Sequence, residues 1–407
     1  MNRNEIIGKK NGINHDKKQK YSTKNANRTL ISTVFYLLFA GILLSCKPKE
    51  PPIPLFTTTP YQLEIPAYFP TLLNIPDDNP LTVEGIELGR YLFYDGRLRG
   101  YTGTNPDSLM SCATCHLQKN AFKCGLDHPK YPNGKTVGIT GIPTPHCMMP
   151  LFNLVFNHNG YLWNGMVYSE NPDIQFRNLE DIVRMGIIAP HEMNSTIEQS
   201  VNAIASISLY PPMFKAAFGT EEVTADRIQK AIAQFLRTLV SSNSRFDKYV
   251  CGEPLLTNEE LQGYILFTTE TGADCFHCHG TSGNLLMTTN LYYNNALDTV
   301  FTDTRDRFAV TNKPADKGAY RAPSLRNIAV TAPYMHDGRF KTLDEVIDFY
   351  SEELQSSPYV HPLMHKINDG GAMLTPHQKQ QLKAFLHTLT DNDLLTNPQY
   401  SKPKDLP

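Results

Sequence analysis

Two copies of one cysteine–histidine frame constrain this chain of 407 residues more than any other feature of its sequence. The residues of the two frames are Cys112, Cys115 and His116 in the first half and Cys275, Cys278 and His279 in the second. This C-x-x-C-H spacing is typical of covalent haem attachment, because two thiols can add to the two vinyl groups of one porphyrin while the adjacent histidine reaches the iron. A Cys₄ zinc site or a redox C-x-x-C pair needs no histidine after each pair. The sequence therefore predicts two covalently bound haem c groups.

The composition limits the partners that this chain can have. Lysine and arginine together number 38, and aspartate and glutamate number 40, so the net charge is -2. Because no basic surplus exists to neutralise phosphates, we expect no nucleic-acid partner. Hydrophobic residues make up 41% of the chain, which is enough to build buried cores in two or three domains.

The N-terminal segment 1–46 is typical of an export signal rather than of a folded domain. A basic stretch precedes an apolar run over residues 30–44, which is short for a membrane span but suits the core of a signal peptide. The run ends in a sequence that resembles a bacterial lipoprotein cleavage box, so we expect a lipid on Cys46 and a Pro-rich tether over 47–69. An uncleaved anchor helix is the alternative. Bacterial haem attachment takes place outside the cytoplasmic membrane, which agrees with an exported, periplasmic protein anchored to the membrane by a lipid.

The segments that follow the two frames resemble each other. Residues 149–166, MPLFNLVFNHNGYLWNGM, correspond to residues 322–339, APSLRNIAVTAPYMHDGR. No run of alternating apolar residues stands out as the core of a sheet. We therefore predict a mainly α fold with two cytochrome c-like haem domains related by internal duplication, over residues 70–248 and 255–395.

Capping residues mark where several helices begin. Thr257, Thr342 and Thr375 each stand three residues before a Glu or Gln, which is the capping-box pattern of a helix N-terminus. The helices that close the two halves, over 224–240 and 375–390, carry apolar residues at i, i+3, i+4 and i+7. This spacing predicts one buried stripe on each closing helix.

The two frames lie about 160 residues apart, with LWNG after the first and TAPYMHDGRFKTLDEV after the second. This combination resembles the bacterial di-haem cytochrome c peroxidase family over roughly residues 70–392. The family includes MauG, the enzyme that matures the tryptophan-derived quinone of methylamine dehydrogenase. The resemblance implies that the first haem is the reactive site for peroxide, that the second haem stores or relays an electron, and that an aromatic residue couples the two.

The resemblance assigns roles to individual residues. His116 would be the proximal ligand of the reactive iron, and His279 that of the relay iron. Trp163, the only tryptophan in the chain, matches the bridging aromatic residue, with an ordinary core position as the alternative. Glu192 matches a distal-pocket glutamate that could take a proton from hydrogen peroxide and return it to the leaving oxygen, with a solvated loop charge as the alternative. His191 beside it is expected at the surface, or to share that proton.

The sixth ligand of the second haem falls on Tyr350, 14 residues after the histidine of the HDG sequence. Tyr350 shares a predicted helical face with three apolar residues, so we expect it to point inward. Peroxidases of the family usually have methionine there, and MauG has tyrosine. A phenolate ligand stabilises ferric iron and favours higher oxidation states. An ordinary core tyrosine is the alternative, in which case Met364 and then Met335 are the next candidates.

Two departures from the family concern the first haem. Many members have a distal histidine that leaves during activation, but the corresponding stretch 136–141, TVGITG, has none. We therefore expect the first iron to stay open, with His128 and His146 as nearby substitutes. A pocket glutamine of the family is Ile182 here.

The interdomain calcium that the resemblance implies is left in doubt. The asparagine that helps to hold it is replaced near Cys147, although the backbone carbonyls of Thr331 and Pro333 remain as ligands. In an oxidising compartment two of Cys124, Cys147 and Cys251 could form a disulfide, and the sequence does not say which two.

Three functions remain open at this point. The first is a peroxidase that reduces hydrogen peroxide to water with electrons from a small cytochrome c or cupredoxin. The second is a MauG-type enzyme that oxidises a protein or organic substrate, which Tyr350 favours. The third is a non-catalytic electron-transfer cytochrome, which would give Glu192 no role. A homodimer is also left open.

Overall fold

The computed structural model describes residues 56–126, 128, 135–166, 178–254 and 256–406. Residues 1–56 and 57–407 form two separate units, and the fold described below is that of the second. The predicted signal peptide and lipid site at 1–46 lie outside the described residues, and no helix within those residues is long and apolar enough to cross a bilayer.

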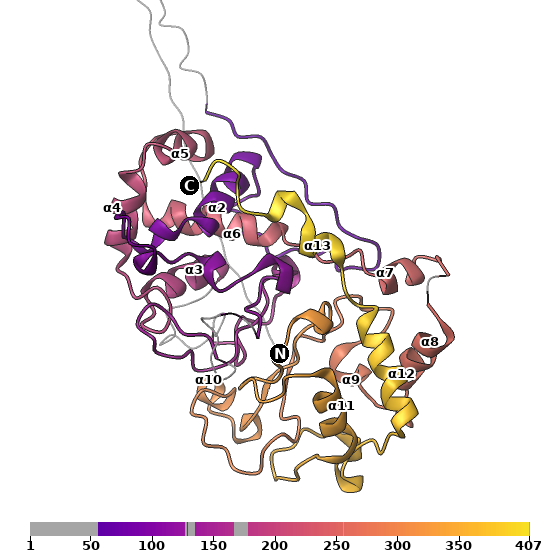
Figure 1. Ribbon diagram of the computed structural model, residues 1–407. Helices are drawn as coiled ribbons and strands as arrows, with labels where there is room; N and C mark the ends of the chain where they lie inside the picture. The colour runs from indigo at the N-terminus through magenta and orange to yellow at the C-terminus, as the bar shows by residue number, and fades with distance from the viewer. Residues whose placement is uncertain (1–55, 127, 129–134, 167–177, 255, 407) are drawn as a thin grey trace, which may run out of the picture. The chain divides into compact units, whose positions relative to one another are not determined.

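Helices dominate the part of the chain that the structure describes (Figure 1). The helices before residue 240 are α2 (Val83–Tyr94), α3 (Leu179–Ile188), α4 (Ile197–Ala205), α5 (Tyr210–Phe218) and α6 (Ala225–Thr238). Those after it are α7 (Arg245–Val250), α8 (Asn258–Phe267), α9 (Phe276–His279), α10 (Phe308–Thr311), α11 (Leu343–Glu352), α12 (Pro376–His387) and α13 (Asn392–Thr396). The strands β1 (Tyr292–Tyr293) and β2 (Tyr320–Arg321) pair antiparallel, with Tyr292 opposite Arg321. The prediction of a mainly α fold is confirmed.

Side-chain caps begin the helices where the sequence predicts them. Thr257, Thr342 and Thr375 each form a complete capping box at the start of α8, α11 and α12. Each box satisfies backbone N–H groups that have no partner inside the helix. Two further boxes, at Thr196 and Ser244, begin α4 and α7, whose starts the sequence analysis did not predict.

Two helix pairs cross with their backbones in close contact, and a glycine permits each crossing. A Cβ atom added to Gly89 of α2 would lie 1.9 Å from the carbonyl oxygen of Ala231 in α6. A Cβ atom added to Gly263 of α8 would lie at the same 1.9 Å from the carbonyl oxygen of Gln381 in α12. Because a real Cβ cannot approach a backbone atom this closely, both crossings require a residue without a side chain.

The buried apolar residues form two large clusters. The first fills the space between α2, α3, α5 and α6, and the second lies between α8, α11 and α12. The stripes predicted on the closing helices are buried, as shown by Ile232 in α6 and by Phe385 in α12, each with 0% exposure. After α12 the chain returns to the first cluster, where Leu394 of α13 and Leu406 are buried (Figure 1). The predicted internal duplication and domain bounds stay predictions.

The described end of the predicted tether, residues 57–69, contacts the helical body. The backbone N–H of Tyr61 donates a hydrogen bond to the carbonyl of Leu81 at 2.9 Å. Phe69 is buried in the second cluster, with its ring centroid 5.4 Å from that of Phe156. This end of the segment is therefore held by backbone pairing and apolar burial.

Candidate functional site

The second frame lies on a short helix that brings its two cysteines and its histidine to one cavity. Cys275 caps α9, while Cys278 and His279 belong to it, and all three line the cavity. The Nδ1 atom of His279 lies 3.1 Å from the carbonyl oxygen of Pro323, so that Nδ1 carries the proton and Nε2 keeps its lone pair. Burial lowers the pKa of His279 to about 4, which keeps the imidazole neutral, as a metal ligand must be.

The first frame repeats this arrangement. Cys112 begins a single 3₁₀ turn, Cys112–Thr114, and the backbone N–H of His116 donates back to the Cys112 carbonyl at 2.9 Å. The Nδ1 atom of His116 lies 2.6 Å from the carbonyl oxygen of Phe122, and burial lowers the pKa of His116 to about 4. In both frames a backbone carbonyl therefore holds the imidazole in the tautomer that presents Nε2. The thiols and the oriented imidazoles fit two haem c groups.

Glu192 lies close to the first frame, in the turn that follows α3. Its carboxylate is among the groups that raise the pKa of the Cys112 thiol to about 12, after burial of the thiol itself. Burial raises the pKa of Glu192 to about 7. Its side chain is nevertheless 36% exposed, so solvent reaches the carboxyl and weakens the rise in its pKa. A carboxyl that titrates near neutrality can both accept and return a proton.

The stretch 136–141 packs directly against Glu192. The backbone N–H of Ile139 donates to the carbonyl oxygen of Glu192 at 2.9 Å. A Cβ atom at Gly138 would lie 2.3 Å from the same oxygen, so this contact also needs a glycine. The segment that lacks the family's histidine thus borders the candidate acid–base residue. His191 reaches the Glu192 carboxylate only at 4.0 Å, and burial lowers its pKa.

His146, one of the two suggested substitutes for a distal histidine, is engaged elsewhere. Its Nε2 atom lies 2.6 Å from a carboxylate oxygen of Asp303, which also accepts a hydrogen bond from the Tyr320 hydroxyl at 2.6 Å. The Tyr320 ring stacks on His336 with 3.7 Å between centroids. His146 therefore belongs to a polar cluster beside the cavity at the second frame, which is called the second cavity below. His128 stays a prediction in this respect.

Trp163 comes from the segment after the first frame, yet its side chain lines the cavity of the second. The ring is 9% exposed, and its N–H donates to the carbonyl of Cys147 at 2.7 Å. Its own carbonyl accepts from the backbone N–H of Arg321 at 2.8 Å. The first bond orients the ring and the second holds its backbone beside this cavity, while a bridging role for Trp163 stays a prediction.

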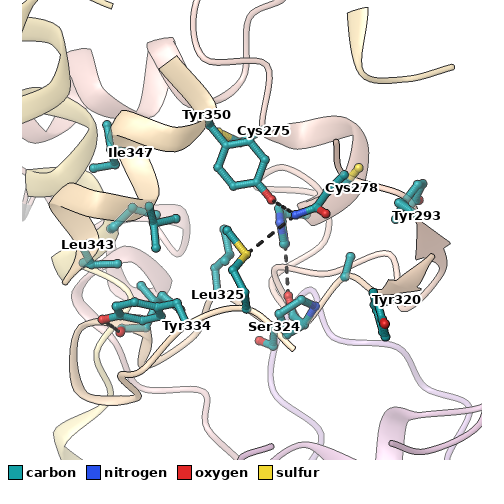
Figure 2. A pocket seen from close by; sticks show the side chains of 18 of the residues that line it. Cys275, Cys278, Tyr293, Tyr320, Ser324, Leu325, Tyr334, Leu343, Ile347 and Tyr350 are labelled. Carbon is teal, nitrogen blue, oxygen red and sulfur yellow. Dashed lines mark hydrogen bonds between the residues drawn. The ribbon is translucent and has the colours of Figure 1, made fainter. Parts of the chain in front are cut away.

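All three candidates for the sixth ligand of the second haem line the same cavity, namely Tyr350, Met335 and Met364. Figure 2 shows the Tyr350 ring extending from α11 toward Cys275 and Cys278. The Tyr350 hydroxyl accepts a hydrogen bond from the amide of Asn295 at 2.9 Å. Burial raises the pKa of Tyr350, and the bond from Asn295 opposes that rise because it favours the phenolate. Asn295 was missed by the sequence analysis, since nothing in a single sequence connects two residues so far apart.

The carbonyls suggested as calcium ligands are engaged by a side chain of the chain itself. The carbonyl oxygens of Thr331 and Pro333 each accept a hydrogen bond from the ammonium group of Lys123, both at 2.6 Å. The sequence analysis missed Lys123, and calcium at these carbonyls stays a prediction.

The three cysteines outside the frames differ in their surroundings. Cys124 and Cys147 are buried in one small cluster, with exposures of 0% and 2%, whereas Cys251 is exposed. No disulfide is formed among the described cysteines. The structure therefore brings together only one of the three pairs that the sequence left open.

Fold and site together define a helical protein with two frames for c-type haem attachment. Residues 83–254 match the family described as di-haem cytochrome c peroxidase. The MauG methylamine utilization protein of Methylorubrum extorquens is 32% identical over 327 residues, which cover 80% of this chain and 83% of that protein. The cytochrome c551 peroxidase of Nitrosomonas europaea is 33% identical over 275 residues, which cover 66% of this chain and 73% of that protein.

A solved structure agrees with these relatives. The crystal structure of a MauG-like protein associated with microbial copper homeostasis superposes with a TM-score of 0.71 at 33% identity, covering 84% of this chain and 99% of that one. The chain therefore belongs to the di-haem cytochrome c peroxidase family, which includes MauG. Membership implies two c-type haems and an oxidoreductase. It does not separate a peroxidase from a MauG-type enzyme, because relatives with both names occur at similar identity.

Proposed function

We propose that this protein reduces hydrogen peroxide to water with electrons from a small cytochrome c or cupredoxin. One peroxide, two electrons and two protons give two water molecules. Family membership supports an oxidoreductase of this class. The observation that carries the proposal is Glu192, a carboxyl whose pKa is raised to about 7 beside the first attachment frame.

Cys112, Cys115 and His116 would hold the first haem, and its iron would supply the redox chemistry of peroxide reduction. Glu192 in its carboxylate form would accept a proton from one oxygen of the peroxide. The same carboxyl would then deliver that proton to the other oxygen, so that this oxygen leaves as water. Gly138 and Ile139 hold the backbone of Glu192 in place for both transfers.

Trp163 and the second haem complete the electron path in this proposal. Cys275, Cys278 and His279 would hold the second haem, which would supply a site for electrons from the donor protein. Trp163 would couple the two haems, which is supported by its place in the wall of the second cavity and by the hydrogen bond that orients its ring. Tyr350 would be the second protein ligand of the second iron, supported by its place in the same cavity as His279.

The site of action follows from the same chemistry. The protein is exported and acts on the periplasmic side, where c-type haems are attached and where small donor cytochromes are found. A lipid on Cys46 anchors it to the membrane. A globomycin-type block of lipoprotein processing should leave a longer, unprocessed chain, and normal processing under that block would contradict the anchor.

The exchange Glu192→Gln tests the function. It keeps the size of the side chain but removes its proton chemistry, so we expect the rate of peroxide consumption by the reduced protein to fall by about 10²–10⁴-fold. Glu198→Gln is a matched control, because Glu198 is an exposed acid in the nearby helix α4. Equal rates in both variants would remove Glu192 from the mechanism.

A MauG-type activity on a protein or organic substrate is the second candidate, and the tyrosine in the second cavity favours it. Asn295 donates to the Tyr350 hydroxyl and thereby stabilises a phenolate, which suits an iron kept oxidised rather than one used as a ferrous store. If this candidate holds, the fully oxidised protein reacts rapidly with peroxide at both haems without prior reduction. A requirement for prior reduction supports the peroxidase, and a resting spectrum without any high-spin ferric signal supports a simple electron carrier.

A further inference from the structure

A buried lysine connects two distant segments of the chain next to the second cavity. Lys123 follows the first attachment frame and is 4% exposed. Its ammonium group donates to the carbonyl oxygens of Thr331 and Pro333, both at 2.6 Å, across separations of 208 and 210 residues. Distances this short are typical of charge-assisted hydrogen bonds, so the group binds as a cation.

The surroundings of Lys123 suit an ammonium group and not a calcium ion. Burial lowers the pKa of Lys123, and the neighbouring thiols of Cys147 and Cys124 partly oppose this shift. The two carbonyl oxygens that accept its N–H groups stabilise the ammonium form. Calcium requires six to eight oxygen ligands, among which carboxylates are common. Thiols are soft ligands that do not meet this requirement. A dication between the two carbonyls would also lie against the charge of the lysine.

The two carbonyls belong to a turn that forms part of the second cavity. Tyr334, Met335 and His336, which follow Pro333 directly, all line that cavity, and so does Lys123. A third bond supports the same turn, since the backbone N–H of Cys147 donates to the His336 carbonyl at 2.6 Å. The Cys147 carbonyl in turn accepts from the Trp163 ring at 2.7 Å. The position of the turn, and with it one wall of the cavity, thus depends on the segment that carries Lys123.

We propose that the ammonium group of Lys123 takes the place of a divalent cation at this junction. It is a positioning residue that holds the turn 331–336 against the segment after the first frame and adds one positive charge beside the second haem. The protein is therefore independent of calcium at this site. The proposal goes beyond peroxide chemistry, and its tests do not depend on turnover.

Metal analysis of the holoprotein provides the first test. The holoprotein is passed through gel filtration in buffer with about 1 mM EGTA or about 1 mM CaCl₂, concentrations that empty or fill calcium sites built from oxygen ligands. We expect no bound calcium in either sample. The urea unfolding midpoint and the spectrum of the second haem should be the same in both buffers. One calcium ion per chain, or a loss of stability in EGTA, would overturn the proposal.

Substitution of Lys123 provides the second test. Lys123→Met keeps an unbranched side chain but removes both hydrogen bonds and the charge, and Lys123→Gln keeps a donor without the charge. We expect a lower urea midpoint for Lys123→Met, and a more negative midpoint potential of the second haem in both variants, because a positive charge that disfavours the ferric state is lost. Lys119→Met is the control, since Lys119 lies exposed on the same segment.

The outcomes of the substitutions are distinct. A second-haem potential that does not move in Lys123→Gln contradicts the electrostatic part of the proposal. A Lys123→Met protein that matches Lys119→Met in every measurement contradicts the positioning part. If Lys123→Met yields no folded holoprotein, Lys123→Gln and the metal analysis of the unmodified protein still decide between a lysine and a metal ion.

Discussion

The two attachment frames hold their histidines in the same way but differ in the side chains gathered around them. His116 and His279 each direct Nδ1 at a backbone carbonyl, and burial lowers the pKa of each to about 4. The second cavity is lined by a phenol and two thioethers that can ligate iron, Tyr350, Met335 and Met364. Near the first frame the notable polar group is instead a carboxyl, that of Glu192.

This difference shows how the same attachment frame can be given two different chemical surroundings. A frame that has a second potential iron ligand in its cavity favours a six-coordinate iron, which exchanges electrons without binding small molecules. A frame bordered by a carboxyl that titrates near neutrality favours proton transfer to a bound oxidant. The division of labour that we propose therefore depends on a few side chains contributed by segments far from the frames themselves.

The largest effect is expected for Tyr350→Phe, because it removes the bond that we propose between Tyr350 and the second iron. We expect the resting absorption spectrum of the second haem to change from low-spin to high-spin, while that of the first haem stays the same. Tyr293→Phe is the control, since Tyr293 lines the same cavity and bonds the hydroxyl of Thr289. An unchanged spectrum would pass the ligand role to Met364 or Met335.

The next effect concerns the pH dependence of the first site. The pKa of Glu192 is raised to about 7 and its carboxylate form accepts the proton, so the rate of reaction with peroxide should rise with pH below 7 and level off above it. The expected slope below the pKa is about tenfold per pH unit. Stopped-flow rates between pH 5 and 9 check this, with Glu192→Gln giving a flat profile. A rate that falls as the pH rises toward 7 would show that the protonated form is the active one.

The next prediction concerns the two helix crossings, where we expect a smaller effect, a loss of stability of similar size in each half. Gly89→Ala and Gly263→Ala each force a Cβ atom toward a carbonyl oxygen 1.9 Å away, so the helices must separate. Such overpacking costs about 1–3 kcal/mol of unfolding free energy. Urea titrations followed at the two haem spectra should show which half each variant weakens. Gly283→Ala is the control, since its nearest neighbour would be at 3.7 Å, and equal midpoints for all three variants would argue against the crossings.

The smallest effect is expected for Asn295→Ala. Removal of the hydrogen bond to the Tyr350 hydroxyl costs about 1 kcal/mol, which corresponds to a rise of about 0.7 units in the pKa of the phenol. A spectral titration of the second haem should therefore reach the phenolate-bound form at a higher pH than in the unmodified protein. A titration that does not shift would mean that Asn295 serves only to pack the cavity.

The sequence allowed much of this site to be predicted, but only where neighbouring residues carry the information. The two frames are local, so Cys112 to His116 and Cys275 to His279 could be identified from spacing alone. The capping boxes at Thr257 and Thr375 are equally local, because a helix start depends on residues three positions apart. Trp163, Glu192 and Tyr350 were identified through a family resemblance, and their roles remain proposals.

The parts that could not be predicted depend on contacts between distant segments. Lys123 looks like one more surface lysine until the fold brings the carbonyls of Thr331 and Pro333 to it. Asn295 likewise acquires its meaning only from the position of α11. The tertiary structure decides such contacts, and no short pattern in the sequence records them.

The contacts of the segment that follows α12 have a consequence for how the first frame becomes ordered. The side chain of Gln118, two positions beyond the first frame's histidine, donates to the carbonyls of Leu394 and Asn397 at 3.1 and 2.9 Å and accepts from the hydroxyl of Ser401 at 2.7 Å. These contacts join residues 276 to 283 positions apart in the sequence. The loop after the first frame therefore gains these three hydrogen bonds only when a distant segment packs against it, so the order of the first frame is coupled to the folding of the second half.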